Sequence, residues 1–186
     1  MGPLGEAALG AISRGPPMRF LSALLLSLVA LATSPALSEA GGLPPPTGRP
    51  ILEVSGAIGR TNAPGKAVFD LASIEALGLR ELTTTTPWTE GEQRFSGIDP
   101  LALLAAVEAR GKELEATALD GYRVVVPIAD LERFPMLLAT RRDGRPMPVR
   151  ERGPLWLVYP WSTHPETAEQ PYRGRAIWQL RTIVVR

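Results

Sequence analysis

Two segments of the sequence hold the side chains best suited to chemistry. Residues 83–88 place threonine hydroxyls before Pro87 and Trp88, and residues 159–165 combine two aromatic rings, two hydroxyls and a histidine. Hydroxyls and indoles can line a small-ligand pocket, and histidine can donate a proton or act as an apical metal ligand near neutral pH. The candidate ligand pocket is formed by Thr84, Thr86, Trp88, Tyr159, Trp161 and His164.

Both segments, and a group of arginines, also have a structural interpretation. A run of β-branched threonines is good strand sequence whatever it binds, and a single loop histidine is commonly an exposed surface residue. The arginines surround the turn at residues 143–144 and are Arg141, Arg142, Arg145, Arg150 and Arg152. They could dock an anion or phosphate. The alternative is a solvated hairpin tip, because Asp143 and Glu151 lie among them.

The composition excludes several kinds of site. The chain has no cysteine, which excludes disulfides, cysteine-ligated zinc, iron–sulfur clusters and a thiol nucleophile. Its single histidine excludes a multi-histidine metal site, and a net charge of +1 gives no electrostatic reason to expect a nucleic acid partner. The sequence has no phosphate-binding glycine loop and no serine-hydrolase elbow. We therefore assign no catalytic residue and no metal ligand.

The N-terminal residues resemble a targeting segment. An uncharged apolar run at residues 20–32 follows Arg19 and is shorter than the roughly 20 residues that a membrane span needs. Residues 1–40 are expected to be a signal peptide that starts at Met18 and is cleaved after Ala40. The mature protein would then be periplasmic or secreted and free of the membrane. The alternative is a retained N-terminal anchor.

The remaining pattern predicts a Pro/Gly-rich linker at residues 41–50 and one domain at residues 51–186. Strands are expected at residues 51–58, 82–86, 114–119, 122–127, 136–140, 155–159 and 175–185. Helices are expected at residues 71–77 after Asp70, at residues 101–110 between Asp99–Pro100 and Gly111, and briefly after Asp130. The helix at residues 101–110 is expected to bury an apolar stripe of Leu101, Leu104, Ala105 and Val107. Many strands with a few short helices indicate the α+β class with a mixed sheet.

Several local landmarks follow one another in a distinctive order. They include Leu52-x-Val54-x-Gly56, Trp88, Phe95-x-Gly97, Asp120-Gly121-Tyr122, Asp143-Gly144-x-Pro146, Gly153-Pro154-Leu155 and Ile177-Trp178. In this order and spacing, residues 51–185 resemble the oxidoreductase molybdopterin-binding domain of the sulfite oxidase superfamily. The resemblance implies a sulfite-oxidase-like fold and makes molybdopterin a possible cofactor.

The positions that bind the cofactor in that family hold other residue types here. The resemblance places Thr84 where the enzymes carry the molybdenum-ligating cysteine, and a neutral hydroxyl replaces a thiolate poorly. It places Glu151 and Trp156 near positions where histidine and arginine would bind the anionic pterin phosphate. We therefore expect no bound cofactor. The expected function is a non-catalytic accessory module, a pseudoenzyme that binds a small molecule or a periplasmic protein. The alternative is a molybdopterin-dependent oxidoreductase with a non-cysteine metal environment.

Overall fold

The structure is a computed structural model that describes residues 42–186, so the expected signal peptide lies outside the described residues. The described residues form two five-stranded sheets with a few short helices, which confirms the α+β class. Among these residues, no helix is long and apolar enough to cross a membrane.

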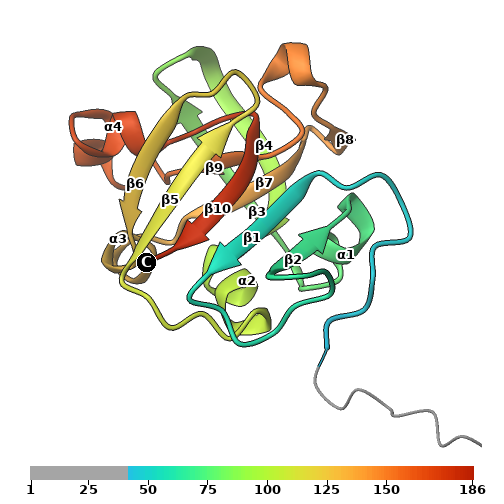
Figure 1. The fold of residues 1–186 in the computed structure, drawn as a ribbon. Helices are drawn as coiled ribbons and strands as arrows, with labels where there is room; N and C mark the ends of the chain where they lie inside the picture. The colour runs from blue at the N-terminus through green and yellow to red at the C-terminus, as the bar shows by residue number, and fades with distance from the viewer. Residues whose placement is uncertain (1–41) are drawn as a thin grey trace, which may run out of the picture. The chain divides into compact units, whose positions relative to one another are not determined.

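The first sheet is mixed and has the strand order β2-β1-β10-β5-β6 (Figure 1). Its strands are β2 (Lys66–Phe69), β1 (Leu52–Gly56), β10 (Leu180–Val185), β5 (Glu113–Ala118) and β6 (Arg123–Pro127). The first strand in the chain pairs in parallel with the last, and every other pair is antiparallel. The two ends of the domain are therefore joined within one sheet.

The second sheet is antiparallel. It consists of β3 (Leu79–Thr86), β4 (Thr89–Ile98), β7 (Leu137–Arg142) and β8 (Arg145–Pro146), and β9 (Trp156–Val158) also pairs with β7. The sequence prediction missed β4, which forms the longest strand. Gly97 lies inside β4 at a register shift opposite β7. A side chain at Gly97 would overlap the carbonyl of Leu138, so the close strand approach requires glycine there.

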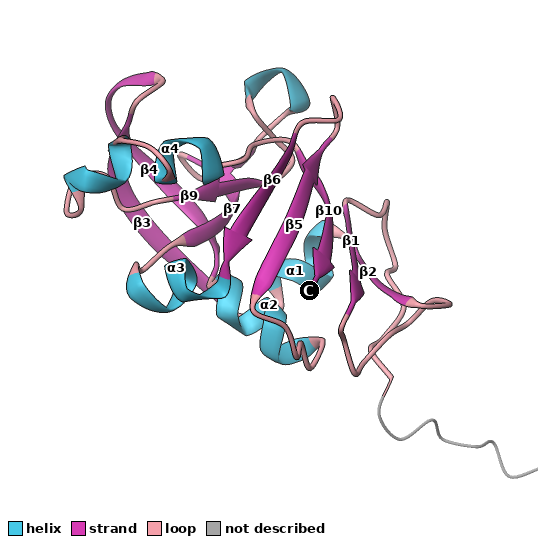
Figure 2. Cartoon of the chain, turned by 60° about the vertical axis from the view of Figure 1, so that its left-hand side comes forward, coloured by secondary structure: helices cyan, strands magenta, loops and turns pink. Residues whose placement is uncertain are grey.

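The helices are short and lie at the ends of the strands. They are α1 (Leu71–Glu75), α2 (Pro100–Ala106), α3 (Ile128–Arg133) and α4 (Tyr172–Arg175), with 3₁₀ turns η1 (Val149–Glu151) and η2 (Pro165–Ala168). Figure 2 shows α2 and α3 at one end of the strands and α4 toward the other. The side chains of Asp70 and Asp99 accept hydrogen bonds from the first turns of α1 and α2, which confirms both predicted N-caps.

Three details of the helix predictions were wrong. α2 ends at Ala106 rather than near Arg110, because Glu108 adopts a left-handed backbone with φ of 51°. Its buried face includes Leu103 and Leu104, whereas Ala105 is exposed. Asp130 is not an N-cap but lies inside α3, where it is buried.

The C-terminal strand is shorter than predicted. Residues 172–175 form α4, and only Leu180–Val185 is strand. Between them the chain pairs with β9 of the second sheet, through Leu157 N–H to Ile177 O at 2.9 Å, before it enters the first sheet. Residues 176–179 therefore cross from one sheet to the other.

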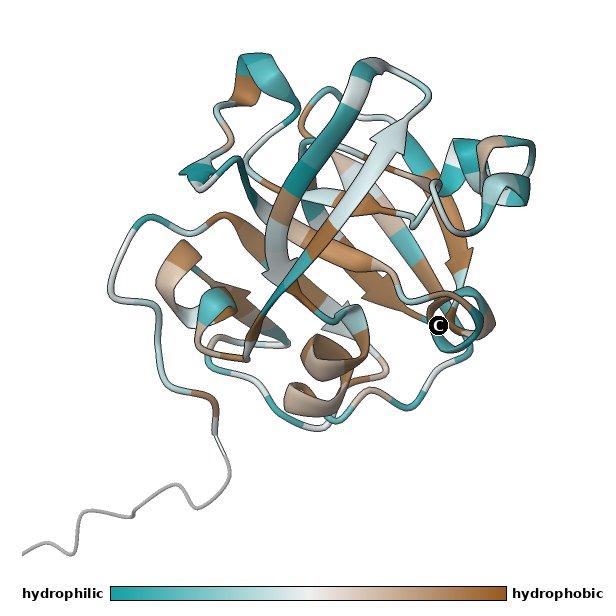
Figure 3. Ribbon diagram, turned by 180° about the vertical axis from the view of Figure 1, so that it is seen from behind, coloured by the Kyte–Doolittle hydropathy of each residue, from teal (hydrophilic) through white to brown (hydrophobic). Residues whose placement is uncertain are grey.

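One apolar core fills the space between the sheets. It collects buried side chains from β1, β5 and β10 of the first sheet and from β4, β7 and β9 of the second. In Figure 3 the hydrophobic stretches follow the strands and α2, while the outer turns are hydrophilic. Burial of these faces supplies the main driving force for folding.

The segment expected to be a linker contacts the domain. Residues 42–50 contain no helix or strand, but the N–H groups of Thr47 and Gly48 donate to Asp70 Oδ2 at 2.8 and 2.6 Å. The Asn62 amide donates to Pro44 O at 2.8 Å. The Asp70 carboxylate thus holds this segment with one oxygen while its other oxygen caps α1.

Candidate functional site

All four tryptophans of the chain lie in one cluster. Trp88 is at its centre, with ring centroids 5.2 Å from Trp178, 5.6 Å from Trp161 and 6.0 Å from Trp156. Most of these pairs are edge-to-face or tilted, which is the favoured geometry for aromatic rings. Trp156 and Trp161 are buried, whereas Trp88 and Trp178 are half-buried. The cluster therefore presents two indoles toward solvent on a rigid aromatic base.

Four separate segments bring these indoles together. Trp88 lies in the turn between β3 and β4, Trp156 begins β9, and Trp161 follows that strand. Trp178 lies on the crossing segment, where it forms a β-bridge with Trp156. The change of sheet at residues 176–179 thus sets the position of the fourth indole.

Arg152 and Arg173 lie over the cluster. The Arg152 guanidinium is 5.3 Å from the Trp156 ring centroid and 5.6 Å from that of Trp178, and it donates to Trp88 O at 3.2 Å. Arg173 lies 5.8 Å from the Trp88 centroid. Arg152 has a left-handed backbone with φ of 70°, a conformation that costs a non-glycine residue energy. Its cation–π contacts and hydrogen bond offset that cost.

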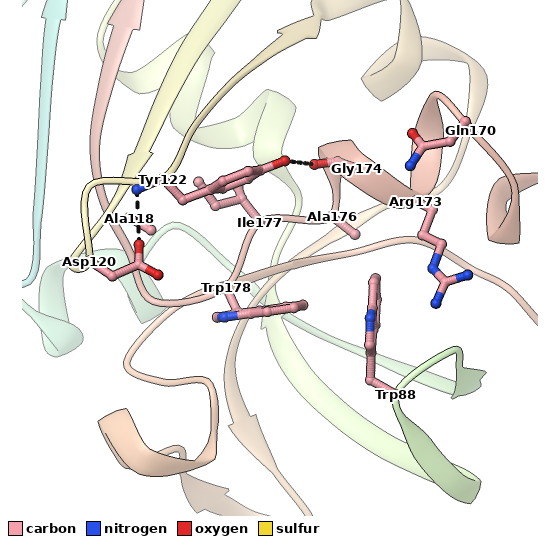
Figure 4. A pocket seen from close by; sticks show the side chains of 10 residues that line it. All are labelled: Trp88, Ala118, Asp120, Tyr122, Gln170, Arg173, Gly174, Ala176, Ile177 and Trp178. Carbon is pink, nitrogen blue, oxygen red and sulfur yellow. Dashed lines mark hydrogen bonds between the residues drawn. The ribbon is translucent and has the colours of Figure 1, made fainter.

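A pocket of about 320 Å³ opens beside Trp88 and Trp178 (Figure 4). This volume is at the lower end of the range for small-molecule sites. Its apolar surface comes from the two indoles together with the side chains of Ala118, Tyr122, Ala176 and Ile177. Its remaining walls are formed by Asp120, Gln170, Arg173 and Gly174. The pocket combines an aromatic wall with a few polar groups, which is typical of a binding site.

The turn between β5 and β6 positions one side of the pocket. Asp120 Oδ1 accepts from Tyr122 N–H at 2.9 Å, and the Tyr122 hydroxyl donates to Gly174 O at 2.9 Å. These bonds fix the tyrosine ring above Trp178, as Figure 4 shows. The strands predicted at residues 114–119 and 122–127 are confirmed as β5 and β6, which pair as a hairpin with a loop of four residues in which only Gly121 has positive φ.

The structure brings some of the predicted site residues together, but inside the protein. Thr84 is fully buried, and its hydroxyl accepts from Ser162 N–H at 2.9 Å. The Thr86 hydroxyl lies 2.8 Å from that of Thr89 and accepts from Trp88 N–H at 3.2 Å. The Thr84 bond attaches the loop after β9 to β3, and the Thr86 bonds hold the turn between β3 and β4.

The other predicted residues lie away from the pocket. The Tyr159 hydroxyl is buried and donates to Asp130 Oδ2 at 3.0 Å, and Arg175 donates to the same oxygen at 2.8 Å. Burial, and then the neighbouring Asp130 carboxylate, raise the pKa of Tyr159 far above its usual range. His164 packs its ring against Phe134 with centroids 5.4 Å apart. Of the six predicted residues, only Trp88 lines the pocket.

The arginines that surround the second turn do not form one anion site. Arg141 makes a two-bond ion pair with Glu75, at 2.7 and 2.8 Å, and Arg142 pairs with Glu151 at 3.0 Å. Arg152 points into the tryptophan cluster instead. The Arg141 guanidinium and the Thr140 hydroxyl hold the pKa of Glu75 below its ordinary value. These arginines therefore join elements of the fold.

The three residues at the positions where the resemblance places the molybdopterin site do not fit that cofactor. The Thr84 hydroxyl is buried and already hydrogen-bonded, and Glu151 is paired with Arg142. The Trp156 ring is fully buried among the other indoles. Within residues 42–186, no group of three His, Cys, Asp or Glu side chains is placed to hold a metal ion.

Comparison with known proteins adds no assignment. No protein-family model matches the chain, and no curated protein matches it. The candidate site therefore rests on the geometry of the described residues.

Proposed function

We propose that this protein is a non-catalytic binding module that holds a small ligand with a planar, apolar face in the pocket beside Trp88 and Trp178. The observation that carries the proposal is the pair of half-buried indoles on one wall, backed by two buried ones. A rigid aromatic wall binds a flat ligand at low entropic cost, because it is ordered before the ligand arrives. We further propose that the fold is sulfite-oxidase-like and that the protein acts outside the cytoplasm.

Binding without catalysis is favoured because the pocket lacks an activated group among its described lining residues. The Tyr122 hydroxyl donates a hydrogen bond to Gly174 O, and Asp120 Oδ1 accepts one from the Tyr122 N–H. Neither side chain is paired with a second group in the way that activates a nucleophile or a general base. We prefer this function to a molybdopterin-dependent oxidoreductase because the hydroxyl of Thr84 is buried and engaged.

Calorimetric titration of the full chain with a neutral planar probe, para-methylbenzyl alcohol, tests the proposal. Tyr122 is 48% exposed, so Tyr122→Ala removes one wall without opening the core. We expect it to weaken binding roughly threefold to tenfold, the range for an aromatic contact. The matched control is Leu119→Ala, an exposed apolar residue of the same loop that lies outside the pocket.

Two results would overturn the proposal. One is equal probe affinity for Tyr122→Ala, Leu119→Ala and the unchanged chain. The other is stoichiometric molybdenum, or a fluorescent pterin oxidation product, in protein purified from its native host.

A further inference from the structure

We infer that the pocket selects a dipolar ligand, with an anionic group at the Arg173 end, a cationic group at the Asp120 end and a flat apolar middle. This inference rests on the proposed function and names the chemical class of its ligand. An amino-carboxylate whose two charges lie on opposite sides of a ring is the simplest member of that class.

The two charged side chains of the pocket are available to a ligand. Asp120 and Arg173 both line the pocket and are exposed, and neither forms an ion pair within residues 42–186. Asp120 uses one carboxylate oxygen for Tyr122 N–H, which leaves its second oxygen as an acceptor. The Arg173 guanidinium keeps its N–H donors while it stacks over Trp88.

These charges lie at opposite ends of the pocket. Figure 4 shows Asp120 beside the loop between β5 and β6, and Arg173 on the far side next to Trp88. Trp178 lies between them, with Tyr122 on the opposite side of the space. A ligand that spans the pocket must therefore pass an aromatic and aliphatic stretch between two unlike charges.

A ligand with one charge sign satisfies only half of this arrangement. A simple anion would pair with the Arg173 guanidinium but leave the Asp120 carboxylate unpaired, and a simple cation would leave the guanidinium unpaired. Partly exposed charge pairs contribute up to about 1 kcal/mol, which is about fivefold in affinity at 25 °C. Two well-placed pairs should thus favour the dipolar ligand over a neutral one by roughly tenfold to twentyfold.

Four matched probes separate the contributions of charge and ring. They are para-(aminomethyl)benzoate, para-methylbenzoate, para-methylbenzylamine and para-methylbenzyl alcohol, which share one ring and differ in their charges. We expect calorimetry on the full chain to give the highest affinity for para-(aminomethyl)benzoate. That preference should shrink as salt rises, because exposed charges are screened.

Two variants test whether Asp120 binds the ammonium group of the ligand and whether Arg173 binds its carboxylate. Asp120→Asn keeps an oxygen for the Tyr122 N–H and should remove only the preference for the ammonium group. Arg173→Gln should remove only the preference for the carboxylate. Asp143→Asn is the matched control, because it makes the same change in the turn between β7 and β8, outside the pocket.

The outcomes separate this inference from the proposed function. Equal affinity for all four probes, with Tyr122→Ala still weakening them, overturns the dipolar inference and keeps the binding module. Dipolar preference that survives both charge variants also overturns it. Failure of all four probes to bind overturns the inference and the proposed function together.

Discussion

The Asp70 carboxylate provides the sharpest test of the fold, because one buried side chain joins two parts of the domain. Its Oδ1 caps α1 through Ser73 N–H at 2.7 Å, and its Oδ2 holds the N–H groups of Thr47 and Gly48. Asp70→Ala removes these contacts and the longer one from the Thr47 hydroxyl to Oδ2, at 3.4 Å. Asp70→Asn keeps the cap but turns an amide NH₂ toward two N–H donors.

The expected cost follows from these contacts. Loss of an N-cap costs about 1 kcal/mol. The two amides at Thr47 and Gly48 should add about 1.5 kcal/mol together, the size of two ordinary hydrogen bonds and less than two bonds to a buried charge, because both residues are exposed and can bond water instead. Asp70→Ala should then lower the free energy of unfolding by about 2.5 kcal/mol, a fall in Tm of about 8 °C.

Denaturant unfolding and amide hydrogen exchange together measure the effect. Asp70→Ala should lose global stability and exchange protection at Thr47 and Gly48, whereas Asp70→Asn should lose protection there with a smaller global loss. Asp143→Asn, in an exposed turn, is the control and should change stability by less than about 0.5 kcal/mol. Unchanged protection at Thr47 and Gly48 in both Asp70 variants would refute the reasoning.

The same carboxylate makes stability depend on pH. Hydrogen bonds from Ser73, and after them those from Gly48 and Thr47, hold the pKa of Asp70 well below its usual range. The unfolded chain binds a proton near pH 3.9, so the stabilisation is complete above about pH 5 and is lost as pH falls. Between pH 5 and pH 3 the unchanged chain should therefore lose more stability than Asp70→Ala.

Three further substitutions test the core and the candidate site by denaturant unfolding. Gly97→Ala should destabilise by roughly 3 kcal/mol, because its methyl group meets the Leu138 carbonyl; a loss below about 1 kcal/mol would mean that the strands can separate there. Trp156→Ala should cost about 4 kcal/mol and broaden the tryptophan signals in NMR spectra, since the ring is the buried base of the cluster. Tyr159→Phe should cost about 1 to 2 kcal/mol by removing a donor from buried Asp130, and a stabilised variant would contradict that role.

The sequence predicted elements with local signals and missed those that depend on distant partners. Asp70, Asp99 and the turn at residues 143–144 carry local chemistry, and the structure places two caps and a hairpin there. β4 was missed because residues 89–94 are mostly charged or polar and mostly exposed. The β3 and β7 strands on either side, rather than intrinsic propensity, make it a strand.

Most of the candidate site was missed for a related reason. Trp88 was identified, but Trp178 was assigned to a continuous strand, and its place in the pocket depends on the crossing between sheets. Asp120 and Tyr122 were recognised only as a local landmark between two predicted strands, although the turn that contains them places both in the pocket wall. The polar residues Thr84 and Tyr159 were expected in a pocket, but Thr84 accepts from the Ser162 N–H and Tyr159 donates to the buried Asp130 carboxylate.

Because all four tryptophans lie in one cluster, the near-ultraviolet circular dichroism and the tryptophan fluorescence of the protein both depend on that cluster. With ring planes crossing at 80° to 90° in the pairs that include Trp178, the indole transitions are close enough to couple, so near-ultraviolet circular dichroism should carry a signature of this cluster. Emission excited at tryptophan wavelengths comes entirely from the same corner of the molecule. Occupancy of the pocket can therefore be followed optically without a label, while events at the opposite end of the sheets leave that signal unchanged.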